Sequence, residues 1–275
     1  MTGAIKVSVP ATVAANRDDE LHLWYARVPA EEADPLAASQ YALLCPQERL
    51  RMGHYRTEAL QRRYRVTRAL VRTALAAHTH AAPQRLRFAE TSYGRPEIAE
   101  PLELVGEWHF NVSHTEDLVV VLIGRQPAFG VDVEDPARPA PWRVAQHFFA
   151  EPEIRLLEGL PPARRAARFW DLWTLKESYA KALGLGLSLP FDTFWFEFDE
   201  QDRIVMHIDP SPLHPGGIWG FFQSDLLGHR LALCTAQHTA TPIRLHLWES
   251  IPTLQARAGM LLPTRRSRSE GDGRP

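Results

Sequence analysis

Two acidic segments of this chain contain the residue types that bind a hard cation and handle phosphate. The first, FGVDVED, runs from Phe129 to Asp135, and the second, WTLKESYAK, runs from Trp173 to Lys181. Magnesium prefers one or two protein carboxylates together with phosphate oxygens and water. Together the two segments predict one magnesium and phosphate site.

The secondary structure expected for each segment determines where its acids point. In QPAFGVDVED, apolar residues alternate with acids, which predicts a strand with Asp132 and Glu134 on one face. The segment Arg164–Leu183 has helical periodicity and is followed by glycine, which predicts a helix. That helix carries Glu177 and Lys181 one turn apart. It therefore offers a third carboxylate for the metal and a cation for a phosphate.

Each motif also has an ordinary structural explanation when it is taken alone. A DxE at the end of a strand is often a polar rim, and Glu177 with Lys181 resembles a solvated ion pair. The neighbouring Trp170, Trp173 and Tyr179 are unusual on a merely solvated helix face. These aromatic residues favour the catalytic interpretation.

Three shorter motifs accompany the acidic strand and the helix in a fixed order. They are SYGRP at 92–96, FNVSHT at 110–115 and GLGLSLP at 184–190. Over roughly residues 20–240 this order resembles the 4′-phosphopantetheinyl transferases of the larger, single-chain, surfactin-synthetase (Sfp-like) type, which combine a YGKP turn, an FNxSHS strand, a GxDxE strand and a WxxKExxxK helix. The residues that match the last two motifs are Gly130, Asp132, Glu134, Trp173, Lys176, Glu177 and Lys181.

The order of expected elements suggests two similar halves. The first half is expected to contain helices between about 46 and 78 and strands near Leu21–Arg27, Arg85–Ala89, Trp108–Val112 and Leu118–Ile123. The second is expected to contain the strand Phe129–Glu134, helices near Trp142–Phe149, Glu151–Glu158 and Arg164–Leu183, and strands near Thr193–Phe198, Ile204–Ile208, Ile218–Phe222 and Arg230–Cys234. The resemblance implies an α+β fold of two pseudo-symmetric halves, each a small, mainly antiparallel sheet packed with helices, with the coenzyme A cleft between them.

The chain is expected to divide into four parts. Residues 1–19 lack a sustained period and predict a flexible N-terminus. Residues 20–127 form the N-terminal half, which is expected to bind coenzyme A phosphates, and residues 128–245 form the C-terminal half with the magnesium site and the catalytic helix. Residues 246–275 form a C-terminal extension. Leu245–Leu262 is expected to pack as an extra strand and helix, and the polar, charged end predicts a disordered tail.

The resemblance implies an enzyme that transfers the phosphopantetheine arm of coenzyme A to a serine of an apo carrier protein and releases adenosine 3′,5′-bisphosphate. The partners it implies are acyl or peptidyl carrier proteins, or carrier domains, of fatty-acid, polyketide or nonribosomal peptide synthases. The implied metal is Mg²⁺, held by Asp132, Glu134 and Glu177. Glu177 is also the candidate general base, acting directly or through water.

The resemblance further implies residues that bind coenzyme A. Lys181, His114 and Arg95 are expected at its phosphates, and Lys176 near the phosphate or pantetheine region. Arg51 and Arg63 are the candidates for the adenosine 3′-phosphate. Two acids complete the expectations: Glu153 is a secondary candidate close to the active cleft, and Glu48 stands where the family pattern would place a cation.

Composition limits the other function classes. The net charge is −2, yet residues 49–72 contain eight arginines, which suits a polyphosphate or an acidic partner. An arginine-rich nucleic-acid binder and a magnesium-dependent phosphodiesterase or nuclease remain alternatives, but no nucleic acid is expected as a partner because no DNA- or RNA-binding motif accompanies the arginines. The longest apolar run, Leu118–Gly124, is too short for a membrane span and no signal-peptide pattern begins the chain, so a cytoplasmic protein without a membrane partner is expected. Cys45 and Cys234 indicate no disulfide framework, and the family type implies a monomer.

Overall fold

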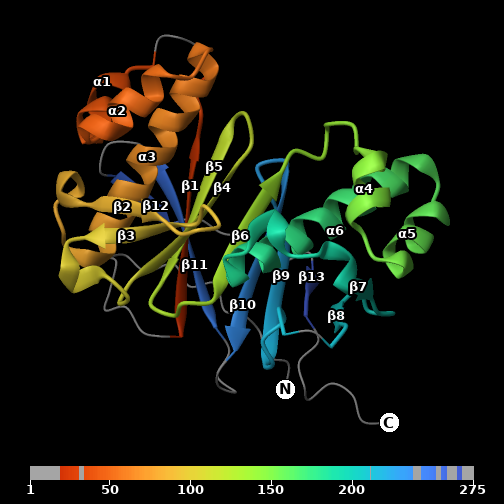
Figure 1. Cartoon of the computed structure of the whole chain (residues 1–275). Helices are drawn as coiled ribbons and strands as arrows, with labels where there is room; N and C mark the ends of the chain where they lie inside the picture. The colour runs from red at the N-terminus through yellow and green to blue at the C-terminus, as the bar shows by residue number, and fades with distance from the viewer. Residues whose placement is uncertain are drawn as a thin grey trace. The chain divides into compact units, whose positions relative to one another are not determined.

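The computed structural model describes residues 19–30, 34–210, 212–237, 243–251, 255–258 and 265–267. Within these residues the chain forms two units, which are both visible in Figure 1. The N-terminal unit extends to Pro127 and takes up the chain again at Ile243, whereas the C-terminal unit begins at Ala128 and includes residues 265–267. The expected flexible N-terminus up to residue 18 and the expected tail from residue 268 lie outside the described residues.

The N-terminal unit is built on a five-stranded sheet with the order β12-β11-β1-β5-β4. Its strands are β1 (Glu20–Arg27), β4 (His109–His114), β5 (Leu118–Gly124), β11 (Arg244–Ile251) and β12 (Gln255–Ala258). A separate hairpin consists of β2 (Arg87–Glu90) and β3 (Pro96–Glu100), and the helices are α1 (Ala37–Leu43), α2 (Pro46–Gly53) and α3 (Glu58–Thr79). Among the described residues of this unit, every strand pair is antiparallel except β1 with β11.

The apolar strand β5 and the helix α3 form the core of this unit. Every residue of β5 is buried, and Val119, Val121 and Ile123 pack in one cluster with Leu70 and Val71 of α3. The hydroxyl of Thr57 caps the start of α3 by accepting from a backbone N–H in the first turn. The uninterrupted apolar sequence of β5 and the apolar face of the amphipathic helix α3 therefore explain why α3 packs on the sheet.

The C-terminal unit is built on a four-stranded antiparallel sheet with the order β13-β9-β10-β6. Its strands are β6 (Phe129–Glu134), β9 (Ile218–Leu226), β10 (His229–Gln237) and β13 (Arg265–Arg266), and β7 (Phe194–Phe198) pairs with β8 (Ile204–Ile208) in a hairpin. The helices are α4 (Trp142–Phe148), α5 (Glu151–Glu158) and α6 (Pro162–Leu183).

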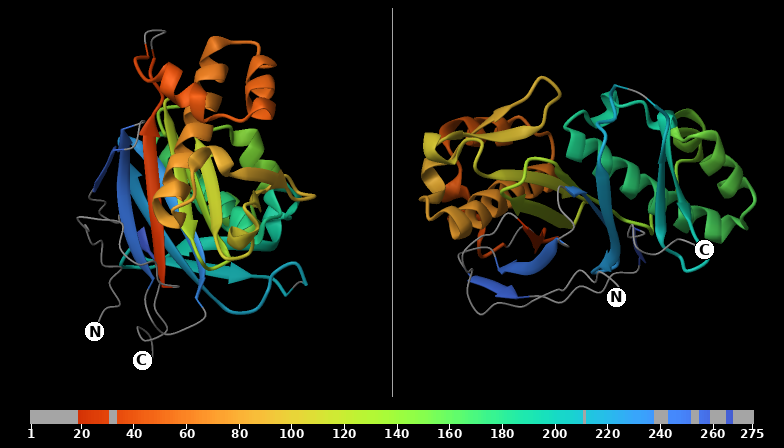
Figure 2. Two further views of the ribbon diagram at one scale, coloured as in Figure 1. Left: turned by 90° about the vertical axis from the view of Figure 1, so that its left-hand side faces the viewer. Right: turned by 90° about the horizontal axis from the view of Figure 1, so that it is seen from below.

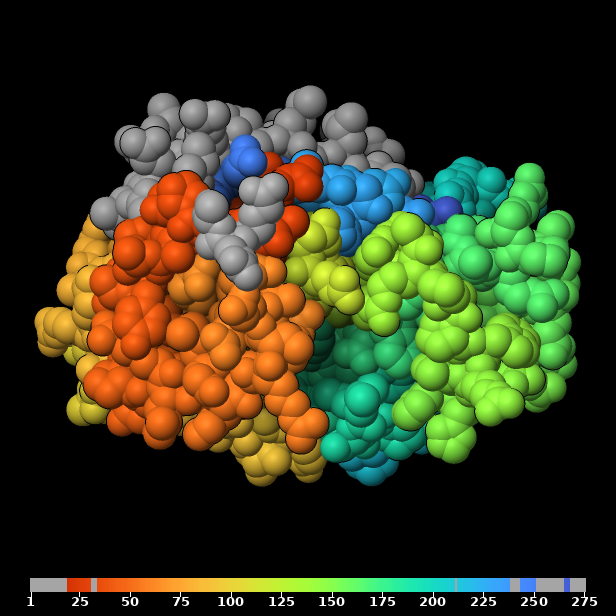
Figure 3. All heavy atoms as spheres, turned by 90° about the horizontal axis from the view of Figure 1, so that it is seen from above, coloured from red at the N-terminus to blue at the C-terminus, as the bar shows by residue number. Residues whose placement is uncertain are grey.

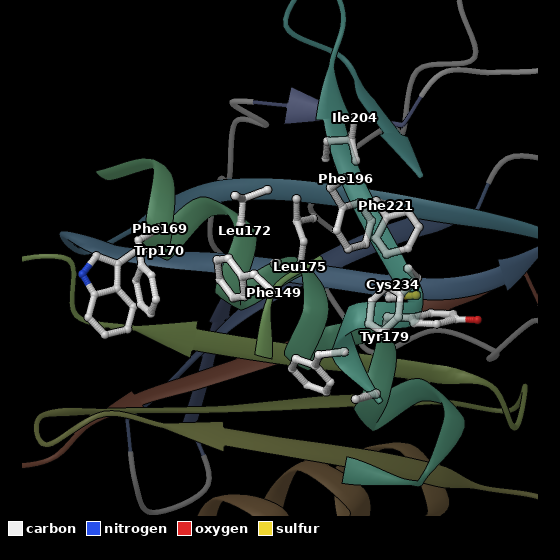
Figure 4. Close-up of a cluster of buried hydrophobic side chains, with 14 of the residues drawn as sticks. Phe149, Phe169, Trp170, Leu172, Leu175, Tyr179, Phe196, Ile204, Phe221 and Cys234 are labelled. Carbon is white, nitrogen blue, oxygen red and sulfur yellow. The ribbon is translucent and has the colours of Figure 1, made fainter. Parts of the chain in front are cut away.

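Aromatic side chains fill the core of the C-terminal unit around α6. Figure 4 shows Phe149, Phe169, Phe196 and Phe221 among the side chains gathered along α6, and all four are buried. The helix ends at Gly184, whose φ of 74° is a left-handed conformation that favours glycine. The 22-residue helix α6 thus buries one side against these aromatic side chains.

The α+β class and the two helix-and-sheet halves expected from the sequence are confirmed. Each unit contains one 22-residue helix against a mainly antiparallel sheet: α3 packs on β5 in the first, and α6 packs on β6 and β10 in the second. The ends of β6, α5 and β8 coincide with the expected ones. The helix α1 and the strand β3 were not foreseen.

The C-terminal extension returns to the N-terminal unit. β11 lies parallel to β1, with Leu23 opposite Leu247 and Trp24 opposite Trp248, and the left view of Figure 2 shows red β1 beside this blue strand. β12 then pairs with β11. Where an extra strand and a helix were expected, the described residues 244–251 and 255–258 are both strands, so the helix is not found there.

Among the helices of the described residues, none is long and apolar enough to span a membrane.

Candidate active site

The strand β6 and the helix α6 lie in direct contact at Gly130. A Cβ added at Gly130 would come within 2.6 Å of the backbone nitrogen of Ala182 and 3.0 Å of the Cβ of Lys181. Any residue other than glycine would therefore force the strand and the helix apart. The glycine brings the helix turn with Glu177 and Lys181 onto the strand face that carries Asp132 and the second acid of the DxE motif.

Four predicted site residues, named here the acidic group, meet at this contact: Asp132, Glu134, Glu177 and Lys181. The ammonium of Lys181 donates to Oδ1 of Asp132 at 2.6 Å, and the Asp132 side chain is only 4% exposed. Glu177 lies close enough to both strand acids to interact with their charges. Arg138 approaches Oε2 of Glu134 at 3.8 Å from the solvent side. The motifs therefore converge in space as their order in the sequence suggested.

Burial and mutual repulsion shift the pKa values in the acidic group. Burial, followed by the charge of Asp132, raises the pKa of Glu134 to about 7. The same two causes raise the pKa of Glu177 to about 7. Burial alone would lower the pKa of Lys181, but Asp132 and Glu177 more than compensate and raise it. The three carboxyl groups therefore repel one another when they are ionised, and an added cation would relieve this repulsion.

One contact in the site was not foreseen as a functional one. The indole of Trp173 hydrogen-bonds to Glu134 and so favours the ionised carboxylate. Trp173 lies one helical turn before Glu177, a spacing that places both side chains over the same strand face. The tryptophan of the WxxKE motif therefore orients a strand acid as well as contributing to the core.

Comparison with known families covers both units. A family model described as "4'-phosphopantetheinyl transferase superfamily" matches residues 128–234, and one described as "4'-phosphopantetheinyl transferase, N-terminal" matches residues 33–125. A 4′-phosphopantetheinyl transferase of Bacillus subtilis is 30% identical over 167 residues, which are 61% of this chain and 70% of that protein. This chain belongs to the 4′-phosphopantetheinyl transferase superfamily. The Sfp-like resemblance and the enzyme family expected from the motifs are confirmed.

Two further matches cover less of this chain. The 4′-phosphopantetheinyl transferase gsp of Aneurinibacillus migulanus is 29% identical over 136 residues, 50% of this chain, and the match spans only 54% of that relative's own length. A solved holo-(acyl-carrier-protein) synthase from Bacillus anthracis is 18% identical and covers 41% of this chain and 97% of its own. Its TM-score of 0.35 is too low to support a conclusion.

The acidic group fits magnesium by its chemistry but is not preassembled. Three carboxylates are the hard oxygen donors that Mg²⁺ prefers, and their mutual repulsion favours added positive charge. Within the described residues, however, no three His, Cys, Asp or Glu side chains are spaced as ready metal ligands. The cation beside Asp132 in this structure is the ammonium of Lys181. The expected metal ligation by Asp132, Glu134 and Glu177 therefore stays a prediction.

Lys176 differs from its expected role. Its ammonium is fully buried, lies 2.8 Å from Oε2 of Glu153, and donates to the backbone carbonyls of Phe191 and Phe194 at 2.6 and 2.5 Å. Glu153 in turn accepts from the backbone N–H of Phe196 at 3.0 Å. Neither side chain is accessible to a ligand, so the expected coenzyme A contact of Lys176 is corrected. With Glu153, expected near the cleft, it forms an interior ion pair that joins α5, α6 and β7.

Two predicted coenzyme A residues occupy the hairpin and sheet of the N-terminal unit. Arg95 ends a turn closed by the N–H of Thr91 donating to its carbonyl at 2.9 Å, and Gly94 in that turn has a φ of 79°. The guanidinium of Arg95 donates to the carbonyl of Pro127 at 3.3 Å, and burial lowers its pKa. His114 is exposed at the end of β4. Their contact with coenzyme A stays a prediction.

The other two candidates lie on the arginine-rich helices, which are orange at the surface in Figure 3. Arg51 on α2 is exposed and pairs with Glu90 Oε1 at 2.7 Å. Arg63 on α3 is half-buried, and within the described residues its guanidinium has no ion-pair partner. Both remain candidates for the 3′-phosphate, and Arg51 would have to leave Glu90 to bind it.

Glu48 stands among arginines for a structural reason. Its carboxylate accepts from Arg68 Nε at 2.6 Å and from Arg72 Nη2 at 2.7 Å, and it also accepts from the backbone N–H of Cys45. Burial opposes its charge, but the arginines and this backbone bond lower its pKa. Arg65 pairs in the same way with Asp34 at 2.9 Å. Several of the eight arginines therefore hold the N-terminal unit together instead of facing a ligand.

Proposed function

We propose that this protein transfers the 4′-phosphopantetheine arm of coenzyme A to a serine hydroxyl of an apo carrier protein, with Mg²⁺ required. The single observation that supports it is the acidic group, in which three carboxylates and a lysine meet where α6 lies on Gly130, in a chain of this superfamily. Such a group suits phosphoryl transfer, where catalysis is mainly positioning and charge stabilisation.

The residues of the acidic group take distinct roles in this proposal. Asp132, Glu134 and Glu177 would hold Mg²⁺, which when bound neutralises negative charge on the pyrophosphate. Glu177 accepts the proton of the carrier serine, and its raised pKa of about 7 suits a base that works near neutral pH. The serine oxygen forms the new P–O bond while the bond to the bridging oxygen breaks, and adenosine 3′,5′-bisphosphate leaves.

Cations stabilise the leaving group and bind the nucleotide in this proposal. Lys181 contacts the pyrophosphate, since its ammonium already lies within the acidic group. Arg51, Arg63, Arg95 and His114 of the N-terminal unit bind the phosphates of coenzyme A, as the family resemblance implies. Coenzyme A is thus the co-substrate, and no nucleic acid or membrane is a partner.

The proposed partners are acyl or peptidyl carrier proteins, or carrier domains, of fatty-acid, polyketide or nonribosomal peptide synthases. The proposed role therefore includes the biosynthesis of secondary metabolites. A monomer working in the cytoplasm completes the proposal. Which carriers are modified depends on surface complementarity between the two proteins.

The deciding experiment is incubation with Mg²⁺, coenzyme A and a panel of apo carrier proteins, read by intact mass of the carrier. The expected result is a gain of one phosphopantetheine, lost in Glu177→Gln and kept in the control Glu151→Gln, an acid whose side chain is 76% exposed on α5. Absence of any gain together with absence of coenzyme A binding contradicts the proposal. Hydrolysis of coenzyme A without a carrier would instead favour the phosphodiesterase alternative.

A further inference from the structure

The ammonium of Lys181 occupies a place in the acidic group where a divalent cation would bind. It lies 2.6 Å from Oδ1 of Asp132, and the two side chains are only 23% and 4% exposed. The stem of Lys181 is held against β6, because its Cβ would lie 3.0 Å from a Cβ at Gly130. The backbone contact between α6 and β6 therefore keeps this cation beside the strand acids.

Asp132 is the carboxylate around which the other charges are arranged. Its charge contributes to raising the pKa of both Glu134 and Glu177, and the charge of Lys181 opposes both shifts. Lys181 is thus a counter-ion shared by all three acids. A second cation that approaches Asp132 meets both the occupied oxygen and the repulsion of the ammonium.

We propose that Lys181 is a stand-in cation, which holds Asp132 in the ligand-free protein and moves to the coenzyme A pyrophosphate when a divalent cation takes its place. The inference rests on the proposed function for the identity of the ligand. The exchange keeps the charges balanced. The ammonium of Lys181 moves from the Asp132 carboxylate to the pyrophosphate, and the metal takes over neutralisation of the carboxylates. Metal and coenzyme A therefore bind cooperatively, and each strengthens the other by the same factor.

The test is the binding of Mn²⁺ to the full chain, measured from the free Mn²⁺ signal in electron paramagnetic resonance, with and without coenzyme A. Titration of coenzyme A alone corrects for Mn²⁺ that it binds in solution. In the unaltered protein, coenzyme A is expected to tighten Mn²⁺ binding roughly tenfold or more. Lys181→Met keeps the apolar stem and removes the charge, so it is expected to tighten Mn²⁺ binding without coenzyme A and to abolish most of the cooperativity.

A charge control separates exchange from general electrostatics. Arg164→Met removes a positive charge from the exposed first turn of the same helix, about 25 Å from Lys181 along the axis. It is expected to leave Mn²⁺ binding and cooperativity unchanged. If Lys181→Met unfolds, as judged by circular dichroism, Lys181→Gln replaces it.

Three results would overturn the exchange: no Mn²⁺ binding by the unaltered protein, no gain in Lys181→Met, or an equal gain with and without coenzyme A. An equal gain would mean that the lysine only repels the metal and does not change partner. Transfer to carriers is read separately. Cooperative binding accompanied by hydrolysis of coenzyme A in place of transfer leaves the exchange in place and contradicts the proposed function, whereas transfer without cooperativity does the reverse.

Discussion

Lys176 and Glu153 form an ion pair in the interior of the C-terminal unit, with 2.8 Å between Nζ and Oε2 and no exposure of either side chain. Lys176 immediately precedes Glu177, the proposed base. Successive helix residues point about 100° apart, so anchoring one of them sets the direction of the other. The interior pair thus fixes the rotation of α6 that presents Glu177 to the strand acids.

Lys176→Met is expected to destabilise the protein by about 3 to 5 kcal/mol, because it leaves the Glu153 carboxylate buried without its partner. The double variant Lys176→Met with Glu153→Gln is expected to recover part of this loss, since no uncompensated charge remains. Urea denaturation of the two variants measures both effects. Equal stability of the single variant and the unaltered protein would contradict the structural role of the pair.

Gly130→Ala is expected to separate β6 from α6 at the acidic group. The added methyl would lie 2.6 Å from the backbone nitrogen of Ala182, where no flexible side chain can give way. A cost of about 1 to 3 kcal/mol is expected for such overpacking, with loss of carrier modification. Thermal unfolding and the intact-mass assay measure the two consequences. Gly159→Ala is the control, since its nearest contacts would be at 3.6 Å and its φ is −71°.

Acid is expected to destabilise the N-terminal unit through a buried histidine cluster. The ring of His22 on β1 lies 4.1 Å from that of His78 on α3 and 4.8 Å from that of His246 on β11, between ring centroids. His78 and His22 accept hydrogen bonds from the indoles of Trp24 and Trp248, at 3.0 and 3.3 Å, which requires neutral acceptor nitrogens. Glu20 lies 3.8 Å from His246 and is the acid on this cluster's border.

Burial, followed by the neighbouring histidines, lowers the pKa of His22 to about 2 and that of His78 to about 3. Below pH 6.5, the ordinary pKa of histidine, the unfolded chain therefore binds more protons than the folded chain. The free energy of unfolding therefore decreases as the pH is lowered. At pH 5, each of these two histidines lowers the free energy of unfolding by about 2 kcal/mol. Hydrogen exchange of the β1 and β11 amides between pH 7.5 and 5 measures this.

The non-titrating variant His22→Gln keeps a hydrogen-bond acceptor and is expected to reduce the pH dependence of β1 and β11 opening by about 1.4 kcal/mol per pH unit below pH 6.5. The exposed His54 at the end of α2 serves as control, since His54→Gln makes the same substitution outside the cluster. A pH dependence that is the same in both variants would exclude His22 as its source.

Glu48→Gln is expected to destabilise the N-terminal unit by about 3 kcal/mol or more, because Arg68 and Arg72 lose their buried counter-charge. Because the pKa of Glu48 is lowered in the folded protein, its contribution to stability is fully present above pH 4.5, the ordinary pKa of glutamate. This contribution is lost as the pH falls below 4.5. Urea denaturation at pH 7 measures the loss. Glu58→Gln, on an acid 70% exposed and 4.0 Å from Arg62, should change stability little.

The sequence alone was sufficient for the elements that carry the acidic group. Alternating apolar and acidic residues give β6, and an apolar stripe ending at Gly184 gives α6, because both patterns are local. The order of the motifs also predicted that Asp132, Glu134, Glu177 and Lys181 belong to one site. Fold class and family followed from the same patterns.

Only the tertiary structure decided the partners of individual charges. Lys176 and Glu153 are 23 residues apart, and Glu48 and Arg72 are 24 apart, so nothing local distinguishes these interior pairs from ligand-binding side chains. β11 joins β1 across more than 200 residues, a pairing that depends on packing at a distant sheet edge. Periodicity and capping act within a few residues, whereas burial and ion pairing depend on which segments meet in space, and that depends on the whole chain.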